Sequence, residues 1–307
     1  RSKGATSSQR KYSTARRFSS ASRTSIIKVN ELLQHATEHH YGVPAINVIN
    51  TETIRYAIQA AEDEHMPIII QYWPGFEDHC ALDIIAFAAR YYAERASVPV
   101  AVHQDHSAGY EIAVKGVKAG FPSVMVDGSS LPYEENFQLT KDVVQVAKIF
   151  DVDIEAELGH VGNGSDANDF VNSDHYTDPN LAEEFVEGTG CGSLAIAVGN
   201  AHGPYVKVPN LDMERIKACR EAVSVPLVMH GCSDIPDEQL QEAVNLGMSK
   251  FNIATEYFRS MYRAFEKDIN SGKNDGNGIG LLMDAAPDMR AFVVSKIQLL
   301  NPNHYSL

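Results

Sequence analysis

The chain has 307 residues, of which 44% are hydrophobic, and a formal net charge of −14. This length is sufficient for one large buried core, and the acidic balance offers no basic surface for a nucleic-acid backbone, so we expect no nucleic-acid partner. No run approaches the roughly 18 uninterrupted apolar residues of a membrane-spanning helix, so the sequence also predicts a soluble protein with no membrane partner.

The first 25 residues differ in composition from the rest of the chain. They contain seven Lys or Arg residues, eight serines and no acid. Such a segment is typical of a transit peptide, and Arg-Arg-Phe-Ser-Ser at 16–20 resembles a mitochondrial processing site. A disordered basic arm or an interdomain linker has the same composition. We therefore expect either a mitochondrial location or, without import, a cytoplasmic one, and we place a single folded domain at 26–307.

From Ile26 onward, short β-branched runs alternate with longer amphipathic stretches, which is the pattern of repeated βα units. Eight parallel strands close a barrel, so the sequence predicts a (β/α)8 TIM barrel. The predicted strands are residues 43–48, 67–71, 98–103, 123–126, 153–158, 193–198, 225–230 and 250–253.

The segments between the strands show the apolar recurrence of helices. Residues 159–178, rich in Gly, Asn and Asp, are too long for a simple βα turn, and we predict a mobile lid there. Residues 271–280 contain four glycines and predict a flexible connector. The predicted helices are 52–64, 83–96, 111–118, 134–150, 213–222, 237–246, 255–270 and 287–300.

Three histidines are predicted at the carboxyl ends of three different strands, where active sites of this fold assemble. His106 follows the third strand, His202 the sixth and His230 the seventh. A single strand-end histidine is commonly a structural residue bonded to the backbone. Three such histidines, two of them followed by glycine, instead predict a metal centre with an open position, as in catalytic zinc sites.

Asp105 directly precedes His106. Along an extended backbone the two side chains would point in opposite directions, yet at a strand end Asp105 can still reach a bound substrate. Two roles are therefore open for Asp105, transfer of a proton to or from the substrate and orientation of a ligand histidine.

Six motifs, in this order, resemble those of the class II ketose-bisphosphate aldolases, zinc enzymes that include fructose- and tagatose-bisphosphate aldolases. The resemblance extends from Ile26 to about Leu300. It implies zinc-dependent cleavage or formation of a phosphorylated ketose, with dihydroxyacetone phosphate and an aldehyde as the two halves, and a homodimer or homotetramer. The motifs are HQDH at 103–106, SVMVDGS at 123–129, EAELG at 155–159, AHG at 201–203, HGCSD at 230–234 and FNIATE at 251–256.

The resemblance also implies roles for individual residues. His106, His202 and His230 would bind Zn²⁺, and Asp105 would exchange a proton with the hydroxyl at the cleaved bond. Asp127 and Glu157 match positions that some members use for a second or displaced metal, and we include Glu157 among the catalytic residues. A monovalent cation, Na⁺ or K⁺, is expected beside the substrate phosphate. The expected substrate-binding residues are Asn47, Gln71, Gly203, Lys207, Gly231, Cys232, Ser233, Asn252, Ala254 and Thr255.

Three segments depart from the family pattern. In the lid, Ser165 stands where the family has a glutamate that acts on the ketose carbon, and Asp166 or Asp169 is our expected substitute. Trp73 stands where the family has a small hydroxyl residue near the aldehyde. The usual Gly-Ser-Ala-Gly near the carboxyl terminus is replaced by Asn-Pro-Asn-His at 301–304, and the candidates for binding a second phosphate are Arg259 and Arg290.

These departures leave two other functions open. One is a catalytically weakened barrel with a structural or regulatory role in a larger assembly. The other is a different reaction on the same barrel, such as an isomerisation.

Overall fold

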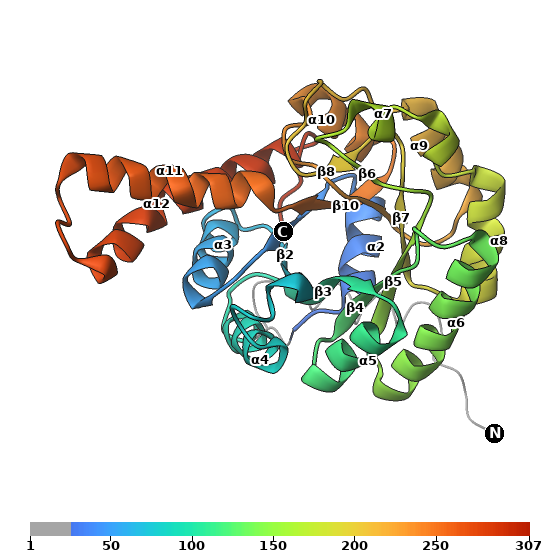
Figure 1. Cartoon of the computed structure of the whole chain (residues 1–307), viewed down its shortest axis with the longest axis horizontal. Coiled ribbons are helices and arrows are strands. Elements are labelled where there is room, and N and C mark those ends of the chain that lie inside the picture. Colours follow the sequence, from blue (N-terminus) through green and yellow to red (C-terminus); the bar gives the residue numbers. More distant parts are fainter. Residues whose placement is uncertain (1–25) are drawn as a thin grey trace.

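A computed structural model of the chain describes residues 26–307 and shows a closed barrel of eight parallel strands surrounded by helices (Figure 1). The strand order around the barrel is β1-β10-β9-β7-β5-β4-β3-β2, which confirms the predicted (β/α)8 architecture. The segment 1–25, with its predicted transit peptide, arm or linker, lies outside the described residues. The barrel strands are β1 (Val43–Asn47), β2 (Ile68–Tyr72), β3 (Val100–Ala108), β4 (Ser123–Asp127), β5 (Asp153–Leu158), β7 (Ser193–Ile196), β9 (Leu227–Met229) and β10 (Met248–Ile253).

Most of the predicted strand ends differ from the structure by one or more residues, and two of the differences bear on the site. β3 continues five residues beyond the predicted end at residue 103, because its backbone bonds to β4 resume at Ser107 after an irregularity. β9 is shorter than predicted and ends at Met229, so His230 lies just beyond the strand. Both differences occur at the carboxyl end of the barrel, where the chain leaves regular pairing and forms the site.

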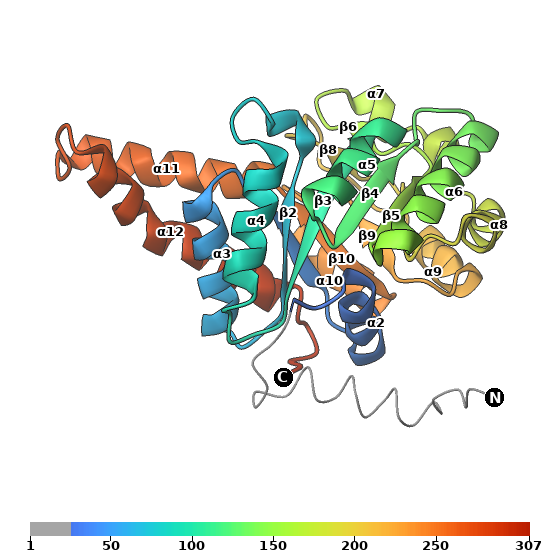
Figure 2. The same cartoon turned by 90° about the horizontal axis from the view of Figure 1, so that it is seen from below.

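Helices cover the outside of the barrel (Figure 2). Sequence patterns did not predict α2 or α8, although Asp178 caps α8 by accepting a bond from the Asn180 amide, and Pro179 begins the helix. The helices are α2 (Val29–His39), α3 (Thr51–Asp63), α4 (Leu82–Ala93), α5 (Tyr110–Ala119), α6 (Tyr133–Phe150), α7 (Ala167–Phe170), α8 (Pro179–Thr189), α9 (Met213–Ala222), α10 (Asp237–Asn245), α11 (Thr255–Ser271) and α12 (Gly278–Leu299), with short 3-10 turns at Pro74–Phe76 and Ser173–His175.

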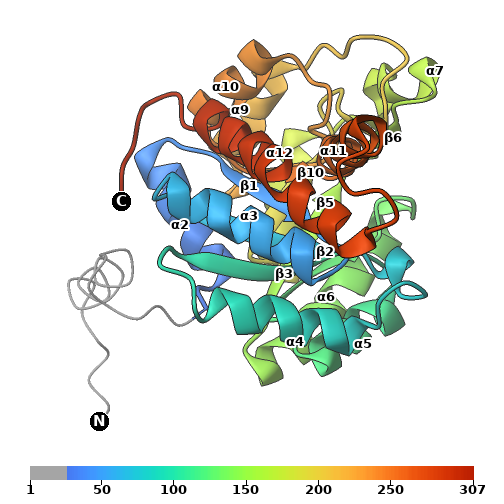
Figure 3. The same ribbon diagram turned by 90° about the vertical axis from the view of Figure 1, so that its left-hand side faces the viewer.

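The last two helices form an antiparallel pair that projects from the barrel (Figures 1 and 2), and α12 packs along α3 (Figure 3). The prediction that α12 starts at Pro287 is wrong, since it begins nine residues earlier, where the side chain of Asn277 caps the amide of Gly280. Pro287 lies inside the helix, so the predicted connector is reduced to the turn at 272–277. No helix among residues 26–307 is both long and apolar enough to cross a membrane.

The predicted lid, 159–178, contains short regular elements. Strand β6 (Gly162–Asn163) pairs with β8 (Ala201–His202), and α7 and the 3-10 turn at Ser173–His175 follow. The lid is therefore attached by backbone pairing to the segment that carries His202.

Candidate active site

A β-bulge near the end of β3 brings two consecutive side chains to one cavity. The register with β4 shifts between Gln104 and Ser107, and His106 has a φ of 37°, in the left-handed region. Because the backbone is not regularly extended at this point, two consecutive side chains need not point in opposite directions. Both residues line a small cavity at the carboxyl mouth of the barrel.

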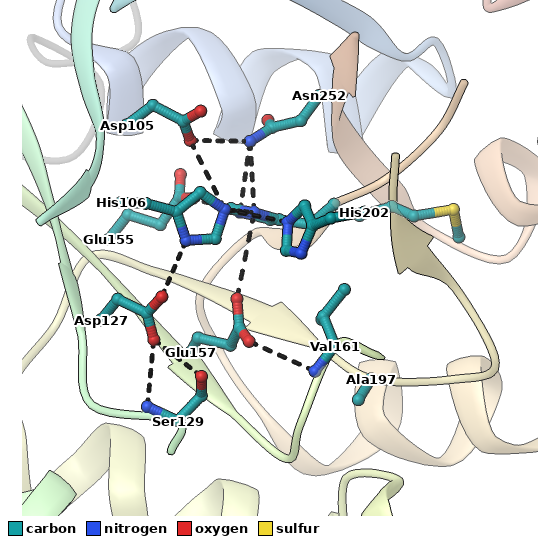
Figure 4. Close-up of polar contacts among 12 residues, drawn as sticks. Asp105, His106, Asp127, Ser129, Glu155, Glu157, Val161, Ala197, His202 and Asn252 are labelled. Carbon is teal, nitrogen blue, oxygen red and sulfur yellow. Dashed lines mark hydrogen bonds and ion pairs between the residues drawn. The ribbon is translucent and has the colours of Figure 1, made fainter. Parts of the chain in front are cut away.

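The rings of His106, His202 and His230 meet beside this cavity, and Figure 4 shows His106 and His202 side by side. Nε2 of His106 lies 2.7 Å from Nδ1 of His230 and 3.0 Å from Nε2 of His202. The other nitrogens of His106 and His230 face Asp127 and Glu155, at 2.8 Å and 2.9 Å, and donate to them. In neutral rings the facing nitrogens of His106 and His230 therefore both carry lone pairs. A proton can be shared by two of these nitrogens, whereas a metal ion can bind one nitrogen from each of the three rings.

The three imidazoles fit a zinc ion. They supply three neutral nitrogen ligands and leave a position open toward the cavity, as in catalytic zinc sites. Asp127 and Glu155 hold two of the rings in the required tautomer, which is the usual role of carboxylates behind ligand histidines. Glu157 contributes a buried oxygen, Oε2, that has no hydrogen-bond partner and lies 3.9 Å from Nδ1 of His230.

The electrostatics of the site also favour a cation. Burial disfavours the charged ring of His106, but Asp105 and Asp127 outweigh it and raise its pKa to about 9. Burial, together with the negative charge of Asp127, raises the pKa of Glu157 to about 8. Burial and the neighbouring His106 lower the pKa of His202 to about 4. Negative charge is thus concentrated around His106, where a divalent ion would be stabilised.

A buried ion pair supports the site from inside the barrel. Nζ of Lys250 lies 2.8 Å and 3.0 Å from the two carboxylate oxygens of Glu155, and both side chains are fully buried. Sequence reasoning did not assign Glu155 or Lys250 a role. The alternation of β5 was the available signal, because Glu155 and Glu157 are two residues apart and share the inner face.

Asp105 is held by two amides. Asn47 donates to Oδ2 at 2.9 Å and Asn252 donates to Oδ1 at 3.0 Å. Burial opposes ionisation, but His106, His230 and the Asn47 bond outweigh it and lower the pKa of Asp105. Gln71, which we expected to contact substrate, is fully buried behind Asn47 and donates to its carbonyl oxygen at 2.7 Å. Asn47 and Asn252 do line the cavity.

Glycine residues and the start of α11 form another part of the cavity wall. At Gly231 the φ is 61°, and a Cβ would lie 1.9 Å from the carbonyl oxygen of Ala201, so only glycine fits. The first turn of α11 lies at the same wall, and its amides have no acceptors within the helix. The cavity residues of this wall are Gly203, Gly231, Ser233, Ala254 and Thr255.

Several predicted residues do not line the cavity. The amide of Cys232 donates to the carbonyl of Asn252, and its thiol donates to that of Met229, both at 3.1 Å. Lys207 is exposed. In the lid, Asp166 caps α7 through the amide of Asn168, and the Ser165 hydroxyl donates to the side chain of Asn163. None of the three predicted residues Cys232, Lys207 and Asp166 lines the cavity of this structure, and neither does Ser165.

A (β/α)8 barrel with three imidazoles and a hydrogen-bonded carboxylate at its carboxyl mouth has the arrangement of an enzyme active site of this fold. The model of the family described as fructose-bisphosphate aldolase class-II matches residues 27–304, and the chain belongs to this family. Membership supports an aldolase-type carbon–carbon lyase activity.

Known proteins resemble the chain over most of its length. YdjI of Escherichia coli K12 is 43% identical over 221 residues, which are 72% of this chain and 80% of YdjI. The crystal structure of the YdjI aldolase superposes with a TM-score of 0.81 at 35% identity and covers 91% of this chain and 98% of its own. The fructose-bisphosphate aldolase of Campylobacter jejuni shares the fold, with a TM-score of 0.76 at 24% identity over 90% of this chain and 95% of its own.

Proposed function

We propose that this protein cleaves and forms a carbon–carbon bond of a phosphorylated ketose, using zinc bound by His106, His202 and His230. The observation that carries the proposal is the meeting of these three imidazoles next to the carboxylate of Asp105 in one cavity. Bound zinc would act as a Lewis acid toward the ketose oxygens and stabilise the negative charge that cleavage leaves on the ketone half.

Asp105 is the proton carrier in this proposal. Its two oxygens accept bonds from Asn47 and Asn252, so the carboxylate is ionised and its orientation is fixed. In cleavage, Asp105 removes the proton from the hydroxyl at the bond that breaks. In condensation it returns this proton to the new hydroxyl.

The phosphate of the ketone half would bind beside Gly203, Gly231 and the start of α11 at Thr255, which line the cavity. Glycine lets the backbone approach an anion closely, and a helix N-terminus favours one. This geometry lets an acidic protein bind phosphate without a basic patch. The proposal includes a Na⁺ or K⁺ ion beside the phosphate to balance its charge.

We propose an aldehyde half that is small or lacks a phosphate. Both arginines considered for a second phosphate are already paired, Arg259 with Asp234 through two bonds of 2.8 Å and 3.0 Å, and Arg290 with Asp63. Among the described residues that line the cavity there is no lysine or arginine that could bind a second phosphate.

The proposed homo-oligomer would form through the projecting α11–α12 pair. This pair exposes four large apolar side chains, and contact with a second copy would remove them from water. They are Tyr262, Ile269, Ile279 and Met283. Analytical ultracentrifugation should show a dimer or tetramer, and Ile279→Glu should shift it toward monomer. A wild-type protein that is monomeric at micromolar concentration would contradict the proposed oligomer.

Turnover assays test the reaction. Zinc-loaded protein is incubated with fructose and tagatose bisphosphates and with ketose monophosphates, and release of dihydroxyacetone phosphate is measured. We expect cleavage of at least one ketose phosphate that stops when a chelator removes zinc. Absence of cleavage throughout this panel, with zinc bound, would contradict the proposal.

A further inference from the structure

A second group of potential metal ligands lies in the lid. One potential ligand atom of each of His160, Asp169 and His175 lies within 4.8 Å of the other two. We propose that they form a further binding site for a divalent transition-metal ion of the zinc class, separate from the barrel centre. Neither the family assignment nor the proposed reaction requires this site.

The distances fit a metal ion better than a hydrogen-bond network. Oδ1 of Asp169 lies 3.2 Å from Nε2 of His160 and 3.6 Å from Nδ1 of His175. Ligand atoms about 2 Å from a tetrahedral zinc are separated by about 3.3 Å, between these two values. The longer contact is outside hydrogen-bonding range. Nδ1 of His175 is buried and has no hydrogen-bond partner, so it is available as a ligand.

Contacts around the cluster hold the ligands in place. Oδ2 of Asp169 accepts a bond from the amide of Asn163 at 2.8 Å, which leaves Oδ1 for a metal ion. That bond is also the main reason why the pKa of Asp169 is lowered. The amide of His160 donates to the carbonyl of His175 at 2.8 Å, so the backbone joins the two ligand segments. Asn172 lies 3.3 Å from Nε2 of His175 and steadies this ring.

The donor set selects the class of ion. Two imidazoles and one carboxylate suit zinc and its first-row neighbours better than Mg²⁺ or Ca²⁺, which prefer oxygen ligands. The three side chains are between 24% and 39% exposed, so water can supply the remaining coordination.

A metal ion here would tie the lid to the strand of a barrel ligand. The Asn163 amide that holds Asp169 belongs to β6, and β6 pairs with β8 in the register Asn163↔His202. The amide of Gly164 also donates to the carbonyl of His202 at 2.8 Å. Loading the lid site would therefore fix the segment between His160 and His175 against the strand that carries His202.

Calorimetric titration of the metal-stripped full chain with Zn²⁺ tests the site. We expect about two zinc ions per chain in the wild type, as three-ligand sites of this kind each bind one ion. His175→Gln should lose the lid ion and keep the barrel ion. His106→Ala should do the reverse. His79→Gln, at an exposed histidine outside both clusters, should bind as the wild type does.

Limited proteolysis gives a second readout that does not depend on activity. Zn²⁺ should slow cleavage within 159–178 in the wild type and in His106→Ala, but not in His175→Gln. A single zinc ion that His106→Ala removes and His175→Gln leaves in place overturns the lid site and leaves the proposed function intact. A single ion with the opposite response supports the lid site and counts against the barrel centre.

Discussion

Nε2 of His230 donates to Oε1 of Glu155 across 2.9 Å, and neither side chain is exposed to solvent. Glu155 thereby fixes which nitrogen of His230 faces the metal position. The same carboxylate balances the buried charge of Lys250. One residue therefore links the metal centre to the stability of the barrel, and the two effects are separable by mutation.

Glu155→Gln should weaken both properties. It leaves the ammonium of Lys250 buried without a counter-charge, so the free energy of unfolding should fall by about 3–5 kcal/mol. Zinc affinity should fall about 10–100-fold, because the partner that orients His230 is altered. Urea unfolding and zinc competition with a chelator measure the two effects.

The double variant Glu155→Gln/Lys250→Met is the control. It removes the unpaired charge, so stability should return while zinc affinity stays low. Equal zinc affinity in the wild type and both variants would show that Glu155 does not position His230.

Asp105→Asn should lower kcat by about 10²–10⁴-fold with the zinc content unchanged, because the amide cannot accept the proton of the substrate hydroxyl. Asp105→Ala should give the same loss. Coupled assays and metal analysis of the same samples check this prediction. Wild-type turnover in either variant would remove Asp105 from the mechanism.

Ser165→Glu should raise kcat by about tenfold or more if the lid lacks the carboxylate that acts on the ketose carbon. Ser165→Gln, which has the same size but no acid, should not. The Ser165 hydroxyl bonds only to Asn163 in this exposed turn, so a longer side chain is tolerated. Identical rates in the Glu and Gln variants would mean that no carboxylate is needed at this position.

His35 should make stability depend on pH. Burial, assisted by the neighbouring His39, lowers its pKa from 6.5 to about 4 in the folded protein. Between these values the unfolded chain binds a proton that the folded chain does not, so stability falls as pH decreases from 6.5 to 4 and is unaffected above this window. Thermal unfolding of His35→Gln should show a shallower pH dependence there, and an unchanged slope would contradict the assignment.

The sequence was sufficient for the barrel and for the residues that meet at its mouth. Buried parallel strands are continuous apolar runs in the sequence, and their carboxyl ends lie at the same end of a barrel. The sequence alone therefore predicts that His106, His202 and His230 lie close together. Local sequence patterns do not predict helix ends that depend on tertiary packing. The prediction that a helix starts at Pro287 is wrong, because this residue lies inside α12.

Other features were not accessible from sequence because they depend on the backbone path. His106 has a left-handed φ, and this backbone turn lets Asp105 and His106 line one cavity. Such a φ is uncommon for a residue other than glycine, so the sequence does not predict it. The pairing of Lys250 with Glu155 joins residues 95 positions apart. The lid cluster depends on the turns between His160 and His175, which periodicity does not specify.

Anomalous scattering at the zinc edge, from crystals of the protein purified with zinc, tests the central claim most directly. A peak should lie about 2.0–2.1 Å from one ring nitrogen of each of His106, His202 and His230. A well-ordered crystal with zinc present in solution and no peak among these three rings would contradict the metal centre on which the proposed reaction depends.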